Sequence, residues 1–224
     1  MLLFIQSANY PIATFLSFAV TIAIAFAYHE FAHAIVADRL GDSTPRAYGR
    51  MTLNPLAHLD RTGMILVLLF GFGWASTPVN PYQLRGNRYR SHALVAVAGP
   101  AANLIMAALF ALPLFVGLVD VAPPVSEVIP SVYSFLAMAV WTNMFLCFFN
   151  LIPIPPLDGF TILQGLLPTD LAYQLEPLRR YGFFLLLGVI FLLPRLGLDV
   201  FGLLVFDPAF YVFSVLSGGG FLFF

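Results

Sequence analysis

A short motif near the N-terminus has the residue types of a metal-dependent hydrolase. Residues 29–33 read His-Glu-Phe-Ala-His, which is the pattern H-E-x-x-H. On a helix, positions four apart lie on one face about 6 Å apart, so the imidazoles of His29 and His33 can bind one Zn²⁺ ion. Glu30 can take a proton from a water molecule bound to that ion. The motif therefore predicts a zinc-dependent peptidase with Glu30 as its general base.

Chance and a merely polar helix end are the two simpler explanations of this motif. The chain has four histidines and three glutamates, so a random match is expected on the order of once in a thousand such sequences. A buried ionisable group costs roughly 3 kcal/mol in a membrane helix. Three such groups side by side without a partner would be poorly tolerated, so we favour the metal site.

A catalytic zinc ion needs a third protein ligand and one open position. Asp158 is a candidate because the proline-rich stretch 153–156 must end the apolar helix before it, and Gly159 follows it. The apolar helix before Asp158 is expected to run back to the side of the membrane that the first helix reaches, which places this carboxylate at the same end of the protein as His29 and His33. From the residues alone, a zinc ligand and an ordinary interfacial carboxylate explain Asp158 equally well.

The composition places these residues in a membrane protein. Of 224 residues, 60% are hydrophobic and 9% are charged, and the mean hydropathy is +0.91. A soluble domain carries about 25% charged residues, which this chain lacks. The net charge is −1 and no stripe of basic residues is long enough to follow a phosphate backbone, which excludes a nucleic-acid partner. A single cysteine, Cys147, excludes a disulfide framework and a multi-cysteine metal site.

The charge-free runs predict an all-α polytopic integral membrane protein with one membrane-embedded domain over residues 1–224. A helix needs about 20 apolar residues to cross the bilayer, and we expect four to five such helices. Between the first two, a Gly- and Pro-rich segment at 45–84 is expected to enter the membrane and return on the same side. The expected helices cover about 11–37, 93–119, 131–152 and 180–198, with an apolar C-terminal segment at 200–224.

The arginines predict the orientation, because short cytoplasmic loops carry the positive charge. One topology places nine of the ten arginines inside, with Arg195 as the exception. Its N-terminus is outside, and the helix that carries the H-E-x-x-H motif runs inward. The distance from His33 to Arg39 is about 9 Å along a helix. The metal would therefore lie within the bilayer, roughly 10–15 Å below its inner surface, and open toward the cytoplasm.

Taken together, the motifs resemble those of the site-2 proteases, which are intramembrane zinc metalloproteases. The resemblance covers nearly the whole chain and is closest to the small prokaryotic type without a PDZ or CBS domain. It rests on residues 29–33, Gly49 to Asp60, Gly71 to Pro81, Gly99-Pro100-Ala-Ala-Asn103 and Asn150 to Asp158-Gly159, which follow one another in the family's order.

The resemblance implies how the site is built. It implies that His29, His33 and Asp158 bind one Zn²⁺ ion per chain and that Glu30 is the general base. It also implies that residues 45–80 form short β-strands beside the site. These strands would belong to the segment that re-enters the membrane.

Four other polar residues lie in or near the expected membrane helices and motifs. The resemblance favours contact of Asn150 with the substrate or the developing oxyanion. For Asn103, this role and a hydrogen bond between helices remain equally open. His58 is expected to support the structure near the site, and His92 to lie at the membrane interface.

The resemblance also implies a reaction and a place in the cell. The expected reaction is hydrolysis of peptide bonds within or near transmembrane segments. The substrate would be a single-pass membrane protein or a membrane-inserted peptide, in the lipid bilayer of a prokaryotic cell (inner) membrane. One alternative is a transporter or scaffold that uses the polar cluster as an ion path. Another is a different zinc peptidase with Glu127 or Glu176 as its third ligand.

Overall fold

The structure is a computed structural model and describes residues 9–58 and 77–216. Its main elements are three long helices: α2 (Pro11–Arg39), α6 (Arg88–Phe115) and α7 (Val132–Asn150). Each is long and apolar enough to cross a membrane, and no other helix in the described ranges meets both conditions. The described chain is thus a helical membrane protein.

Shorter helical segments connect and follow the three long helices. The segments after α2 and α7 are α3 (Thr44–Ala47), α4 (Pro55–His58), α8 (Asp158–Leu166) and α9 (Thr169–Leu175). The C-terminal part consists of η1 (Glu176–Tyr181), α10 (Gly182–Leu187), η2 (Gly188–Leu192), η3 (Pro194–Leu196), η4 (Gly202–Phe206) and α11 (Asp207–Leu216).

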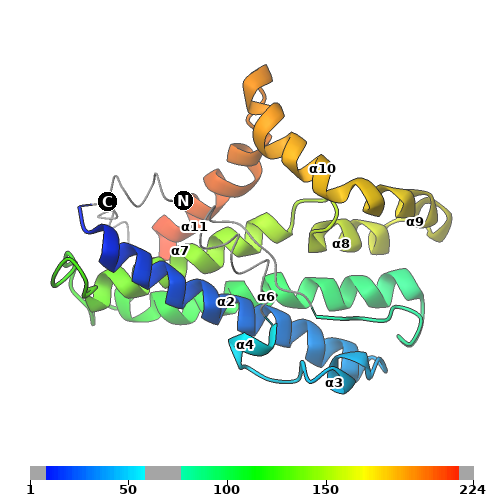
Figure 1. Ribbon diagram of the computed structural model, residues 1–224, viewed down its shortest axis with the longest axis horizontal. Coiled ribbons are helices and arrows are strands. Elements are labelled where there is room, and N and C mark those ends of the chain that lie inside the picture. Colours follow the sequence, from blue (N-terminus) through cyan, green and yellow to red (C-terminus); the bar gives the residue numbers. More distant parts are fainter. Residues whose placement is uncertain (1–8, 59–76, 217–224) are drawn as a thin grey trace.

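Figure 1 shows how these elements are arranged. The helices α2, α6 and α7 pack against one another, and α11 packs on α7. The short helices α3 and α4 contact α2, while α8 lies along α6. The segment from α10 to η4 extends away from this bundle and returns to it. The C-terminal half of α2, the N-terminal half of α6 and the start of α8 therefore meet at one end of the bundle.

The ends of α2 follow from its sequence. Pro11 is its first residue, where the fixed φ angle suits a helix and the missing N–H leaves no hydrogen bond unmade. Gly41 ends it with a φ angle of 107°, which a residue with a side chain rarely adopts. The N–H groups of Gly41 and Asp42 donate to the carbonyls of Asp38 and Ala37, at 3.1 and 3.0 Å.

The other two long helices begin with side-chain caps. The Asn87 side chain accepts hydrogen bonds from the N–H groups of Tyr89 and Arg90 at the start of α6. Ser131 accepts one from the N–H of Ser134 at the start of α7. Beyond Asn150, the prolines in 153–156 prevent α7 from continuing, so the chain turns back and enters α8.

Small residues let the helices approach closely in the core. The largest apolar cluster lies between α6, α7 and α11. Alanines on the facing surfaces of α6 and α7 bring the two backbones together, as is common between membrane helices. The buried members of this cluster are Ala107, Ala111, Leu114, Tyr133, Ala137, Val140, Met144, Cys147, Ala209 and Phe213.

Several details of the expected fold are not found. Three helices in the described ranges can span a membrane, so the expected four to five spans are not confirmed. The expected single helix at 180–198 is instead a series of short helical segments, from η1 to η3. The hydrogen-bond pattern changes to that of a π-helix at Gly188–Leu192, and Pro194 begins a 3₁₀ turn near the end of the run.

The expected strands are also not found in the described part of 45–84. Pro45 and Pro55 occur in the first turns of α3 and α4, and each favours a single helical turn over an extended strand. Residues 77–80 contain no helix or strand. The remainder of the expected re-entrant segment, 59–76, lies outside the described residues.

Candidate metal centre

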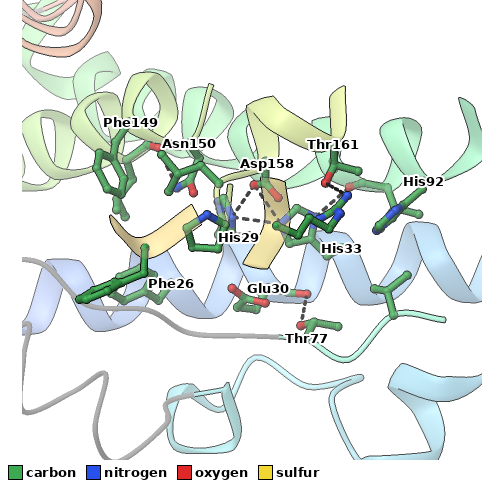
Figure 2. A pocket seen from close by; sticks show the side chains of 18 residues that line it. Phe26, His29, Glu30, His33, Thr77, His92, Phe149, Asn150, Asp158 and Thr161 are labelled. Atoms are coloured by element: carbon green, nitrogen blue, oxygen red, sulfur yellow. Dashed lines mark hydrogen bonds and ion pairs between the residues drawn. The ribbon is translucent and has the colours of Figure 1, made fainter. Parts of the chain in front are cut away.

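Three potential metal ligands from two separate elements meet at the end of the bundle where α2, α6 and α8 come together (Figure 2). The Nε2 atoms of His29 and His33 on α2 are 3.0 Å apart. The Oδ2 atom of Asp158, the first residue of α8, lies 3.1 Å from the former and 3.3 Å from the latter. Within the described ranges, no other group of histidine, cysteine and carboxylate side chains converges in this way.

Helix α6 orients both imidazoles through their Nδ1 atoms. His33 Nδ1 lies 2.8 Å from the carbonyl oxygen of Val95, and His29 Nδ1 lies 2.6 Å from Oδ1 of Asn103. A carbonyl oxygen can only accept, so each Nδ1 carries the hydrogen. In the neutral imidazole, each Nε2 atom then has a free lone pair that faces Asp158.

The three converging atoms fit a bound cation. Two imidazole lone pairs and a carboxylate oxygen repel one another at 3.0–3.3 Å unless positive charge lies between them. Oδ2 of Asp158 is buried and receives no hydrogen bond from any described residue. One shared proton cannot serve all three atoms, whereas a metal ion can. Tetrahedral zinc ligands at about 2.0–2.1 Å from the ion are about 3.4 Å apart, which agrees with this spacing.

The charge of Asp158 agrees with a ligand role. A carboxyl group binds a metal ion in its ionised form, and the usual pKa of an aspartate is about 3.9, so this form is the one expected at neutral pH.

Glu30 is placed to act on a molecule held at this centre. It is 5% exposed and lines a cavity of about 570 Å³ together with the three potential ligands. Among the described residues, its carboxylate has no hydrogen-bond or ion-pair partner. Its backbone carbonyl accepts a hydrogen bond of 3.1 Å from Oγ1 of Thr77, on the lower side of α2 in Figure 2. Because Glu30 lines the cavity, its carboxylate can exchange a proton with a molecule held there.

Two glycines make this geometry possible. A Cβ atom on Gly99 of α6 would lie 2.5 Å from Nε2 of His33 and from Cε1 of His29. A Cβ atom on Gly159 would clash with the backbone carbonyls of Leu151 and Ile152. Gly159 therefore allows the start of α8 to pack against the end of α7, and this packing holds Asp158 over the imidazoles.

The two asparagines singled out from the sequence occupy different places. Asn150 lines the cavity, and its Nδ2 donates a hydrogen bond of 3.0 Å to the carbonyl of Leu146. Asn103 is completely buried behind His29 and does not line the cavity. His58 lies apart from the metal ligands, and its Nε2 donates to the carbonyl of Thr52 at 2.6 Å.

Sequence reasoning missed other residues that line the cavity, among them His92 and Arg179. His92 was expected at the interface, but it lies seven residues before Gly99 and so on the same face of α6, which was a usable signal. Arg179 of η1 had no such signal. Its guanidinium donates to Gln164 at 2.6 Å and to Thr161 at 3.1 Å, and burial lowers its pKa.

Comparisons with known proteins agree with this chemistry. The family model described as Peptidase family M50 matches residues 17–194. YwhC of Bacillus subtilis (strain 168) is 37% identical over 193 residues, which cover 83% of this chain and 84% of YwhC. Rip2 of Mycolicibacterium smegmatis is 32% identical over 200 residues, covering 86% of this chain and 73% of Rip2. Rip2 of Mycobacterium tuberculosis (H37Rv) is 31% identical over 184 residues, which cover 80% of this chain and 68% of that Rip2. The name of each relative describes a zinc metalloprotease. No solved structure matches the chain.

Proposed function

Because the chain belongs to peptidase family M50, the site-2 proteases, we propose that it cleaves peptide bonds within or beside transmembrane segments of single-pass membrane proteins or membrane-inserted peptides. It is an intramembrane zinc metalloprotease. The observation that carries the proposal is the convergence of His29, His33 and Asp158 within 3.3 Å in a cavity that Glu30 also lines. A transporter or scaffold with an ion path is not favoured.

The residues that line the cavity have separate roles in hydrolysis. His29, His33 and Asp158 would hold one zinc ion per chain. When bound, zinc polarises the scissile carbonyl and makes water more acidic. The Glu30 carboxylate takes a proton from the attacking water and delivers it to the leaving amine. Asn150 reaches the same cavity, where its amide donates a hydrogen bond to the carbonyl oxygen of the substrate.

A helical substrate must unwind before its carbonyl can reach the ligands, and the segment 77–80 is suited to hold it. Thr77 and Val79 line the cavity. Hydrogen bonds hold the segment at both ends. The Thr77 hydroxyl donates to the carbonyl of Glu30, and the N–H of Asn80 donates to the Asp42 carboxylate at 2.7 Å. We propose that the unwound substrate pairs with this segment as an added strand.

The proposed setting is a prokaryotic inner membrane, with the site open to the cytoplasm and the whole chain folded as one domain. Four to five helices would span the bilayer. The support is electrostatic: Arg39 ends α2 and Arg88 begins α6 at the end of the bundle that holds the site. Positive residues favour the cytoplasmic side.

Substrate trapping tests the proposal. The Glu30→Gln variant is expressed in its host membrane and crosslinked, and the proteins captured with it are identified by mass spectrometry. We expect single-pass membrane proteins that wild-type enzyme cleaves in detergent and Asp158→Asn does not. Captured proteins that the wild-type enzyme leaves intact at every zinc concentration would contradict the proposed substrate class.

A further inference from the structure

We infer that Asn103 and Asn143 are positioning residues that together fix the orientation and tautomer of His29, so that its Nε2 lone pair faces the metal position. This inference rests on the proposed zinc site. It assigns a task to two amides that neither contact the cavity nor take part in proton transfer.

The two asparagines form a continuous chain of hydrogen bonds from α7 to His29. Nδ2 of Asn143 donates to the backbone carbonyl of Ala139 at 2.9 Å. Nδ2 of Asn103 donates to Oδ1 of Asn143 at 2.9 Å and lies 3.4 Å from the carbonyl of Ala25. Oδ1 of Asn103 then faces Nδ1 of His29 at 2.6 Å.

The direction of every bond in this chain follows from its first acceptor. The Ala139 carbonyl can only accept, so Asn143 must turn its NH₂ group toward it and its oxygen toward Asn103. Asn103 must then present its NH₂ group to Asn143 and its oxygen to His29. The Nδ1 atom of His29 is therefore the donor, and its Nε2 atom keeps the lone pair.

Burial makes the reversed arrangement costly. Both asparagines are 0% exposed, so water cannot replace a lost hydrogen bond. Turning the Asn143 amide over would set its oxygen against the Ala139 carbonyl and its NH₂ group against that of Asn103. An unpaired polar group in an apolar interior costs about 1–3 kcal/mol. The chain of hydrogen bonds therefore has one stable direction.

The two histidines are oriented by different means. His33 bonds directly to a backbone carbonyl, that of Val95, which no side-chain substitution removes. His29 depends on a side chain, Asn103, which in turn depends on Asn143. Substitutions at 103 and 143 therefore change zinc affinity through the orientation of His29, and they do not act through substrate binding.

The test is zinc affinity, measured by competition with a chelating dye on purified protein in detergent. Loss of a hydrogen-bond partner behind a metal-binding histidine typically weakens binding 10–100-fold. We expect this loss for Asn103→Leu, which removes the acceptor. Asn143→Leu should cause a smaller loss, because the Ala25 carbonyl still holds the Asn103 amide. Asn103→Asp keeps an acceptor for Nδ1 of His29 but sets its second oxygen against Oδ1 of Asn143, so its loss of affinity should be smaller than that of Asn103→Leu without full rescue.

Thr142→Val is the matched control. It removes an equally buried hydrogen bond between α2 and α7, the 3.2 Å contact of Thr142 with Thr21, without touching His29. Its zinc affinity should equal that of the wild type. A folded Asn103→Leu variant with wild-type affinity would overturn the inference, as would equal losses for Asn103→Leu and Thr142→Val. If Asn103→Leu does not fold, Asn143→Leu decides: wild-type affinity overturns the inference, and weakened affinity supports it.

The same titration separates this inference from the zinc site itself. His33→Ala removes a ligand and should abolish tight binding. If His33→Ala binds zinc as tightly as the wild type, the proposed site is wrong. If His33→Ala fails to bind while Asn103→Leu and Asn143→Leu bind normally, the site stands and only the positioning role is wrong.

Discussion

Gly99 of α6 lies so close to His33 of α2 that a methyl group in place of its hydrogen would be 2.5 Å from the Nε2 atom of the imidazole. The same methyl group would also meet His29. A helix that carries the acceptors for both imidazoles must lie this near to them, and only glycine leaves the space. The close approach thus links the packing of two membrane helices to the geometry of the metal centre.

We expect Gly99→Ala to weaken zinc binding severely, because the new Cβ atom occupies the space of the imidazole atoms. Overpacking of this kind typically costs 1–3 kcal/mol, which corresponds to about a 5- to 150-fold loss of affinity if it falls wholly on the bound state. The zinc titration measures it. Gly188→Ala is the control, since nothing lies within 4 Å of the added methyl group. Equal zinc affinity of the two variants would show that the imidazoles can move aside.

Glu30→Gln should separate metal binding from catalysis. Glutamine keeps the size of the side chain but cannot take up a proton, so zinc content should stay at the wild-type level while cleavage falls. Positioned general bases contribute about 10²- to 10⁴-fold. Metal analysis and a cleavage assay on one preparation measure both quantities. Cleavage at the wild-type rate would assign the proton transfer to another group.

The sequence predicted the parts of this protein that depend on local pattern. The H-E-x-x-H spacing indicated that His29 and His33 share a helix face, and their Nε2 atoms are 3.0 Å apart. The charge-free runs indicated the long membrane helices, because the thickness of the bilayer sets their length. Membership of the site-2 protease family is confirmed by the comparisons.

Features that depend on tertiary contacts were harder to predict. Asp158 lies 125 residues beyond His33 in the chain, so no local pattern could say that they meet, and the family resemblance was needed. The place of Asn103 behind His29 depends on how α2 and α6 pack.

Cys147 offers a test of folding that does not involve the metal. It is 5% exposed and lies in the core between α6, α7 and α11. We expect its thiol to resist a maleimide reagent in the native protein in detergent and to react after denaturation. The labelled fraction, measured by mass spectrometry, then reports unfolding for each site variant. Rapid labelling of the native wild type would show that this core opens readily.

Removal of zinc should destabilise the wild type but not Asp158→Asn. A ligand that binds only the folded state stabilises it by RT ln(1 + [L]/Kd), which is about 2.7 kcal/mol at a hundredfold excess over Kd. Addition of a strong chelator should therefore lower the Tm of the wild type, and added zinc should restore it. In Asp158→Asn, the neutral amide replaces the ionised ligand, so zinc and chelator should leave the Tm nearly unchanged. Thermal unfolding in detergent, followed through the exposure of Cys147, measures both proteins. A variant that responds to zinc as strongly as the wild type would show that the carboxylate of residue 158 is not a ligand, even though it lies 3.1 Å from His29.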